Sequence, residues 1–265
     1  MTTKNGDIKD FYNFALELVE DAAARAMDFY GQGRHNIRFD EALITRAELE
    51  IGDLFQKRIK DRFPDHQVFD GRTLPEAYSH ESDRYLWIFD PCDGVANYQA
   101  GIPIWGISLA LIENFWPVFG IITLPATKDT FQATGDNAAL WGSRQIKISP
   151  QESIDDESVL LAYSRFHQQY STTFPGKIRN MGSTAAHICH VAMGRADAAI
   201  IANESFQGLA AARVIIEAAG GKIYKIDGSE FFLNEYLDGG RIRDHLLVTT
   251  PSLVNQVAKT LKRII

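Results

Sequence analysis

Apolar residues that recur every three or four positions predict two helices near the start of the chain. The first is expected over residues 8–30, where the apolar stripe ends at the Gly-Gln-Gly of residues 31–33. The second is expected over residues 46–62. Thr45 is placed as its N-cap and Glu48 follows three residues later, which is the capping-box arrangement. Pro64 should end this helix, since proline cannot continue the hydrogen-bond ladder.

Short apolar runs then predict strands. They cover residues 85–89, 105–112, 117–124 and 130–133. Only a short polar segment around Asn114 separates the middle two, so we expect an antiparallel hairpin there. A further pair, residues 128–133 and 144–149, should close this half of the chain.

The polar residues 150–156 mark an expected division of the chain. Beyond them strands and helices alternate, as in an α/β layer. We therefore predict an N-terminal α+β subdomain over residues 1–150 and a C-terminal α/β subdomain over residues 151–265. In the second, strands are expected over residues 159–164, 198–202, 222–226 and 245–250, and helices over 183–193, over 208–218 and from Pro251 to the end.

The charge balance narrows the classes of function. The 265-residue chain carries 27 Lys and Arg against 34 Asp and Glu, a net charge of −7, so it lacks the positive field that non-specific nucleic-acid binding needs. No apolar run approaches the ~20 residues of a membrane helix, and the first residues contain no signal-peptide core. Cys92 and Cys189 are too few for a disulfide framework. We expect a cytoplasmic globular protein that binds neither nucleic acid nor membrane.

The segment with the most chemical content follows the apolar run at residues 85–89. Asp90 and Asp93 stand three residues apart in a bend expected to be opened by Pro91 and closed by Gly94. Two carboxylates so placed suit one hard cation such as Mg²⁺, which prefers oxygen ligands. The same spacing also suits a simple turn in which both carboxylates cap backbone amides. The spacing alone favours neither interpretation.

The flanking residues add a family resemblance. Residues 90–98 read Asp-Pro-Cys-Asp-Gly-Val-Ala-Asn-Tyr, which resembles D-P-[hydrophobic]-D-G-T-x-N-F, the metal-binding signature of the inositol monophosphatase family. Residues 122–149 resemble the hairpin of that family, residues 178–200 its R-x-x-G-S-A-A helix, and residues 211–223 its closing helix and E-A-G-G turn. The four segments come in the family's order and extend over nearly the whole chain.

The resemblance implies an α/β fold, a layered αβαβα sandwich, that commonly forms homodimers. Its members hydrolyse phosphate monoesters of inositol, sugars or nucleotides with two or three Mg²⁺ ions. The substrate implied here is a small phosphorylated polyol or sugar. The site residues that the resemblance implies are Asp70, Asp90, Asp93 and the Cys92 carbonyl for metal, Glu48 and Asp93 for catalysis, and Gly94, Val95, Gly182, Ser183 and Thr184 for substrate.

Two departures from the family pattern concern the attacking water and the first metal ligand. Val95 replaces a threonine whose hydroxyl orients the water, and valine has no donor or acceptor on its side chain. Glu48 replaces the partner aspartate of that threonine. The family glutamate that binds metal aligns with Gly71 without a gap, or with Asp70 when one gap is introduced. Both alignments remain open.

A third departure removes an acid near the closing helix. Counting back from the glycine turn, Gly208 takes the place of a metal-binding aspartate and Gln207 that of a tryptophan. Glu204 or the Gln207 amide has the reach to enter the site, although a neutral amide replaces a carboxylate poorly on Mg²⁺. Phe206 is expected in the core.

These observations support two hypotheses. The first is a Mg²⁺-dependent phosphomonoester hydrolase, with weak activity if the replaced residues limit turnover. The second is a non-catalytic or chemically repurposed relative with a degenerate active site, because Val95, Gly208 and, in one alignment, Gly71 replace expected residues. His187 and His190, three residues apart, have the spacing of a metal pair, but their apolar neighbours favour packed or surface histidines.

Overall fold

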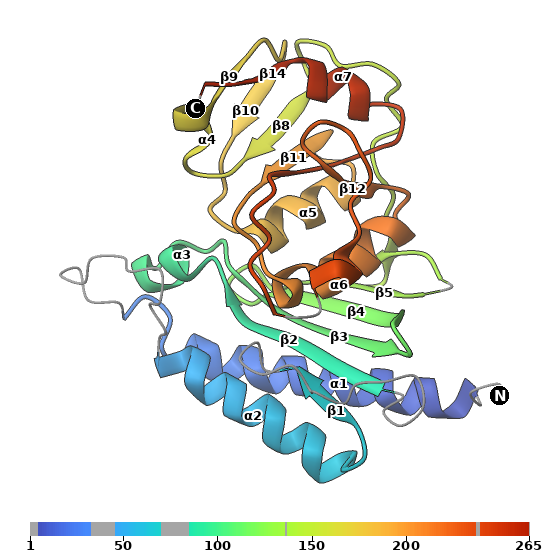
Figure 1. The fold of residues 1–265 in the computed structure, drawn as a ribbon. Helices are drawn as coiled ribbons and strands as arrows, with labels where there is room; N and C mark the ends of the chain where they lie inside the picture. The colour runs from blue at the N-terminus through green and yellow to red at the C-terminus, as the bar shows by residue number, and fades with distance from the viewer. Residues whose placement is uncertain (1–4, 33–45, 70–84, 136, 237–238, 265) are drawn as a thin grey trace.

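The computed structural model describes residues 5–32, 46–69, 85–135, 137–236 and 239–264, and Figure 1 shows their arrangement in layers. Thr45, the predicted N-cap, lies outside these ranges. Helices α1 (Asn5–Met27) and α2 (Arg46–Arg62) lie side by side against one face of a large sheet. α2 has the predicted bounds, whereas α1 ends three residues before the predicted end. Both bury an apolar stripe, with Leu18 and Phe55 fully enclosed.

The large sheet has seven strands in the order in which they occur along the chain. β1 pairs parallel with β2, and every later pair is antiparallel. The predicted hairpin is confirmed: Asn114 and Phe115 join its strands with φ of 48° and 70°, the left-handed geometry of a tight hairpin turn. The strands are β1 (Gln67–Phe69), β2 (Tyr85–Asp93), β3 (Gly106–Glu113), β4 (Trp116–Leu124), β5 (Asp129–Thr134), β6 (Leu140–Trp141) and β7 (Arg144–Gln145).

A five-stranded sheet forms the second β layer, in the order β10-β8-β11-β13-β12. Its first three strands are mutually parallel, and β13 runs antiparallel to both of its neighbours. All four strands predicted for this half are present. The strands are β8 (Val159–Ala162), β10 (Lys177–Arg179), β11 (Ala198–Ile201), β12 (Lys222–Lys225) and β13 (Leu246–Thr249).

Helices α5 (Thr184–Ala192) and α6 (Phe206–Ala218) fill the space between the two sheets (Figure 1). α6 packs on strands β2 to β5 and on α5, and seven of the nine residues of α5 and eight of the thirteen residues of α6 are buried. α6 begins two residues before the predicted start, because Ser205 caps it by accepting a hydrogen bond from the Gly208 amide at 3.1 Å.

The outer face of the five-stranded sheet is covered by short elements. These are α4 (Phe166–Gln169), β9 (Tyr170–Thr172), α7 (Val254–Lys259) and β14 (Leu261–Arg263), and η1 (Leu233–Tyr236) lies beside α6. The prediction of a helix to the end of the chain is wrong for the last residues, since β14 pairs antiparallel with β9. The complete order of layers is αβαβα, which confirms the predicted fold.

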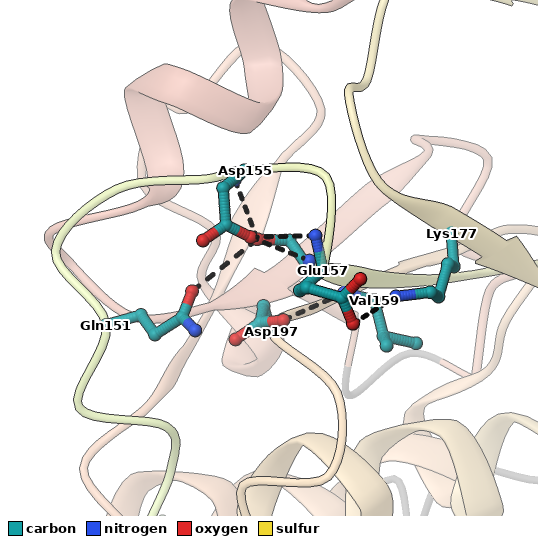
Figure 2. A network of polar contacts seen from close by, with 7 residues as sticks. Gln151, Asp155, Glu157, Val159, Lys177 and Asp197 are labelled. Carbon is teal, nitrogen blue, oxygen red and sulfur yellow. Dashed lines mark hydrogen bonds and ion pairs between the residues drawn. The ribbon is translucent and has the colours of Figure 1, made fainter.

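The polar segment before β8 is an ordered turn (Figure 2). The Asp155 carboxylate accepts hydrogen bonds from the amides of Glu157 at 3.0 Å and Ser158 at 2.9 Å. Asp197 accepts from the Val159 amide at 2.8 Å and so fixes the start of β8. The two sheets lie on either side of this turn in sequence, but one continuous core contains side chains from both. The division into two subdomains therefore stays a prediction.

None of the helices within the described ranges combines the length and the apolar character needed to cross a membrane.

Candidate active site

The two aspartates of the D-P-x-D segment lie at the end of β2, at an irregularity in its pairing with β3. Asp90 is opposite Ser108 and Asp93 opposite Gly106, so Pro91 and Cys92 share a single partner position. The strand thus continues through the segment with a bulge, where the sequence predicted that Pro91 would open a turn. Because a bulge changes the alternation of side chains, both carboxylates come to the same end of the sheet.

Asp93 joins β2 to the beginning of α5. Its Oδ2 atom accepts hydrogen bonds from the Ser183 hydroxyl and from the Ala185 amide, the latter at 2.8 Å. Ser183 is the N-cap of α5 and accepts from the Ala186 amide at 3.1 Å. Burial raises the pKa of Asp93, while the donors of Ser183, Ala185 and Thr184 oppose that rise. The Oδ2 atom of Asp93 is therefore hydrogen-bonded to the start of α5.

The loops at Gly94 and Gly182 meet in a contact that leaves no space for side chains. Gly94 has φ of 80°, and a Cβ there would lie 3.1 Å from the Gly182 carbonyl oxygen. Asn97 donates from Nδ2 to the carbonyls of Ile104 at 2.6 Å and Met181 at 2.7 Å. Gly182, with φ of 75°, would place a Cβ 2.7 Å from that amide. Two segments more than 80 residues apart in sequence are therefore locked together.

Gly94 also begins a helix that the sequence analysis missed, α3 (Val95–Ala100). Glycines in the left-handed conformation stand at both its ends, Gly94 and Gly101, and this pair was the available signal. Val95 is partly buried and packs against the core below α1 and α2. The side chain that replaces the family threonine thus serves as apolar packing.

Glu204 is the third carboxylate of the site, and it arrives from the loop between β11 and α6. The Thr184 hydroxyl donates to its Oε1 atom at 2.5 Å. Burial raises the pKa of Glu204 to about 8, the negative charges of Asp93 and Asp90 add to that rise, and Thr184 and Arg241 oppose it. Sequence analysis offered Glu204 and the Gln207 amide as alternatives, and the structure places Glu204 beside the two aspartates. Phe206 is buried in the core as predicted.

Asp90 has the same unfavourable surroundings. Burial raises its pKa to about 7, Asp93 and then Glu48 add to the rise, and a hydrogen bond from the Cys92 amide at 3.2 Å opposes it. Glu48, in the first turn of α2, is therefore close enough to act on the site electrostatically. The Cys92 thiol is buried with a raised pKa, so it remains protonated and packs as a small apolar group.

The donors of the site are carboxylate oxygens, the type of ligand that a hard cation prefers. Within the described ranges no three His, Cys, Asp or Glu side chains already form a group that would hold a metal ion. Asp70 and Gly71 lie outside these ranges, so neither alignment is tested. Asp90, Asp93 and Glu204 nevertheless gather with raised pKa values, and a divalent cation among them would favour the charged form of all three.

The two histidines of α5 are not a metal pair. His187 is 2% exposed, and its Nε2 accepts a hydrogen bond from the Met181 amide at 3.0 Å. His190 Nδ1 lies 2.8 Å from the Ala186 carbonyl oxygen. One nitrogen of each ring is engaged with a backbone group, and the buried His187 Nδ1 has no hydrogen-bond partner among the described residues. The burial of His187 agrees with the expectation of a packed histidine.

Comparison with known proteins agrees with this architecture. The sequence model of the inositol monophosphatase family matches residues 7–259. A fructose-1,6-bisphosphatase/inositol-1-monophosphatase of Thermotoga maritima is 27% identical over 81% of this chain and 85% of its own length. A histidinol-phosphatase of Chlorobaculum parvum is 26% identical over 83% and 87%. The solved structure of a Thermotoga maritima IMPase superposes with a TM-score of 0.78, covers 95% of this chain and 96% of its own, and is 23% identical.

Proposed function

We propose that this chain, which belongs to the inositol monophosphatase family, hydrolyses the phosphate monoester of a small polyol or sugar with the help of Mg²⁺. The observation that carries the proposal is the convergence of Asp90, Asp93 and Glu204 at the start of α5. The two relatives named above are phosphatases with different substrates, a fructose-1,6-bisphosphatase/inositol-1-monophosphatase and a histidinol-phosphatase. They support the reaction class and leave the substrate to experiment.

Asp90 and Asp93, with Asp70 and the Cys92 carbonyl by family resemblance, would hold Mg²⁺. When bound, the metal supplies charge neutralisation for the phosphate and a water of lowered pKa. In the proposal the protein orients the reacting groups: Glu48 positions the water, and the amides of Gly94 and Val95 face the phosphate.

Ser183 and Thr184 suit the binding of substrate hydroxyls. Each of their own hydroxyls donates to a carboxylate, Ser183 to Asp93 and Thr184 to Glu204. A hydroxyl that donates its proton still has lone pairs with which to accept. A polyol hydroxyl can therefore donate to Thr184, while the contact of Gly182 with Asn97 fixes the loop that precedes both residues.

The experiment that tests this function measures phosphate release. We would offer inositol monophosphate, fructose 1,6-bisphosphate, histidinol phosphate and a nucleoside monophosphate, each with Mg²⁺ and with EDTA. We expect release that requires Mg²⁺ and that Asp90→Asn lowers at least about 100-fold, a loss of about 2.7 kcal/mol in transition-state stabilisation. Release unaffected by EDTA and by the substitution would contradict the proposal.

A second candidate is a non-catalytic or chemically repurposed relative. The packing of Val95 into the core favours it, because no hydroxyl at that position orients a water. If the loss of that hydroxyl limits turnover, Val95→Thr should raise it, and Val95→Ala, which restores no hydroxyl, should not. Binding of a phosphorylated polyol without release of phosphate would favour the second candidate.

We also propose that the chain forms a homodimer, as its resemblance to the family implies, and that it acts in the cytoplasm, as its two cysteines without a disulfide framework indicate. Light scattering coupled to size exclusion checks the assembly: a monomer near 30 kDa would contradict it, since one chain has a mass of 29.7 kDa.

A further inference from the structure

A side chain at position 208 would enter the space that the Glu204 carboxylate occupies beside Asp90. A Cβ built at Gly208 would lie 3.3 Å from Glu204 Oε2, 3.3 Å from Ser205 Oγ and 3.6 Å from Asp90 Oδ2. The first distance is tighter than ordinary van der Waals contact, so an aspartate at 208 would project its carboxylate into the volume that the Glu204 carboxylate fills. An aspartate side chain at position 208 and the Glu204 carboxylate would therefore occupy the same space beside Asp90.

The backbone holds Glu204 in place from both sides. Its carbonyl accepts a hydrogen bond from the Ile242 amide at 2.9 Å, and Arg241 donates to the Asn203 carbonyl at 3.2 Å. Asn203 has φ of 62°, the left-handed conformation that turns the chain sharply before α6. With the backbone fixed in this way, the side chain of Glu204 extends toward Thr184 and not toward solvent.

The hydrogen bond from Thr184 defines which oxygen remains free. The Thr184 hydroxyl donates to Oε1 at 2.5 Å, while Oε2 is the atom nearest to the Gly208 position and to the Asp90 side. Within the described residues no hydrogen bond or ion pair is recorded for Oε2. A carboxylate held by one oxygen and open at the other is suitably arranged to ligate a cation shared with Asp90.

We propose that Glu204 supplies the metal-binding carboxylate for which the family uses the position of Gly208, so that the acid lies four residues earlier in the chain, before the N-cap of α6. This inference rests on the proposed function, because it assigns a ligand to the same Mg²⁺ site. The extra methylene of glutamate and its place before the N-cap allow it to reach the volume that an aspartate on the first turn of α6 would occupy.

The test measures Mg²⁺ binding by titration calorimetry and by the Mg²⁺-dependent shift in melting temperature, with no substrate present. Glu204→Gln keeps the size of the side chain and removes its charge, and it should weaken Mg²⁺ binding at least about tenfold. The matched control is Glu152→Gln, an exposed glutamate that contributes only its backbone carbonyl to a hydrogen bond, which should leave binding unchanged.

A relocation variant separates a ligand from a merely structural residue. Glu204→Ala combined with Gly208→Asp returns the acid to the family position and should recover most of the Mg²⁺ affinity. In the metal-free protein, Glu204→Gln should melt no lower than the parent, because glutamine can still accept the hydrogen bond from Thr184 and carries no charge for burial to penalise. If the affinity of Glu204→Gln equals that of the parent, the inference is overturned and the proposed function stands. If the parent itself binds no Mg²⁺, the proposed function fails and the inference fails with it.

Discussion

The side-chain amide of Asn97 donates to the carbonyl of Met181, 84 residues later in the chain, at 2.7 Å. The same Nδ2 atom donates to the Ile104 carbonyl at 2.6 Å, so one buried amide joins α3, the loop before β3 and the loop before α5. These three segments carry Gly94, Val95, Ser183 and Thr184. The geometry of the candidate site therefore depends on a residue with no assigned chemical role in it.

Replacement of Asn97 by alanine should destabilise the protein by about 2–4 kcal/mol, because two carbonyls lose their donor in a buried place. Urea unfolding monitored by tryptophan fluorescence gives the free energy. An exposed asparagine offers the control: Asn137→Ala removes a single contact to Thr134 at the surface and should cost under about 1 kcal/mol. Equal losses for the two variants would contradict the central role of Asn97.

Gly182 and Gly142 separate the effect of backbone conformation from that of close contact. Both have positive φ, 75° and 57°, but a Cβ at Gly182 would meet the Asn97 amide at 2.7 Å, whereas one at Gly142 would meet nothing within 4 Å. Gly142→Ala should cost about 1–2 kcal/mol for the left-handed conformation. Gly182→Ala should cost at least about 1 kcal/mol more. A smaller cost at Gly182 would show that the loop shifts easily.

Asp90 should destabilise the metal-free protein at alkaline pH. Its folded pKa is about 7, above the ordinary value of 3.8, so the folded state resists ionisation. The penalty is complete above pH 7 and disappears as the pH falls toward 3.8, through the range where only the unfolded chain is ionised. Asp90→Asn should therefore raise the free energy of unfolding at pH 8 in EDTA by about 1–2 kcal/mol, after allowance for solvent screening.

Addition of Mg²⁺ should make the parent more stable than Asp90→Asn, the reverse of their order in EDTA. If the site binds the metal, the parent gains stability in proportion to the logarithm of Mg²⁺ concentration, while Asp90→Asn gains little. Thermal melting at several Mg²⁺ concentrations measures both. A variant that is stabilised as much as the parent would place the metal elsewhere.

His187 should make the protein less stable in mild acid. Burial, with a smaller contribution from nearby His190, lowers its folded pKa to about 4, while an unfolded histidine titrates near 6.5. Above pH 6.5 neither state binds the proton; between 6.5 and 4 only the unfolded chain does, so stability falls as the pH falls. At pH 5 this amounts to about 2 kcal/mol.

A glutamine at position 187 can still accept the hydrogen bond from the Met181 amide but does not titrate. We therefore expect His187→Gln to lose about 2 kcal/mol less than the parent between pH 7 and pH 5. Parent and variant contain the same buried carboxyl groups with raised pKa values. The difference in stability between the two proteins at each pH therefore cancels the opposing effect of those groups. His167→Gln, at an exposed position, is the control and should follow the parent. Parallel pH profiles for His187→Gln and the parent would contradict the prediction.

Local sequence patterns predicted most of the helices and strands, and they were wrong in detail for a few of them. The apolar period and Pro64 predicted the extent of α2, and the polar segment at Asn114 predicted the hairpin. The end of the chain was predicted as a helix throughout, but residues 261–263 pair with β9, a partner about 90 residues away that no local pattern reveals. α3 was missed because six residues are too few for a periodicity to be recognised.

Motif spacing in the sequence by itself was enough to indicate the family, and the order of the layers follows from that resemblance, while apolar periodicity predicted individual helices and strands. It also identified Asp90 and Asp93. Only the tertiary structure decided how the missing acid at Gly208 is related to Glu204, since their relationship depends on the left-handed turn at Asn203 and on a hydrogen bond from Thr184, which is 20 residues away in sequence. Contacts of that kind arise when α5 and α6 pack between the sheets, and packing depends on the whole chain at once.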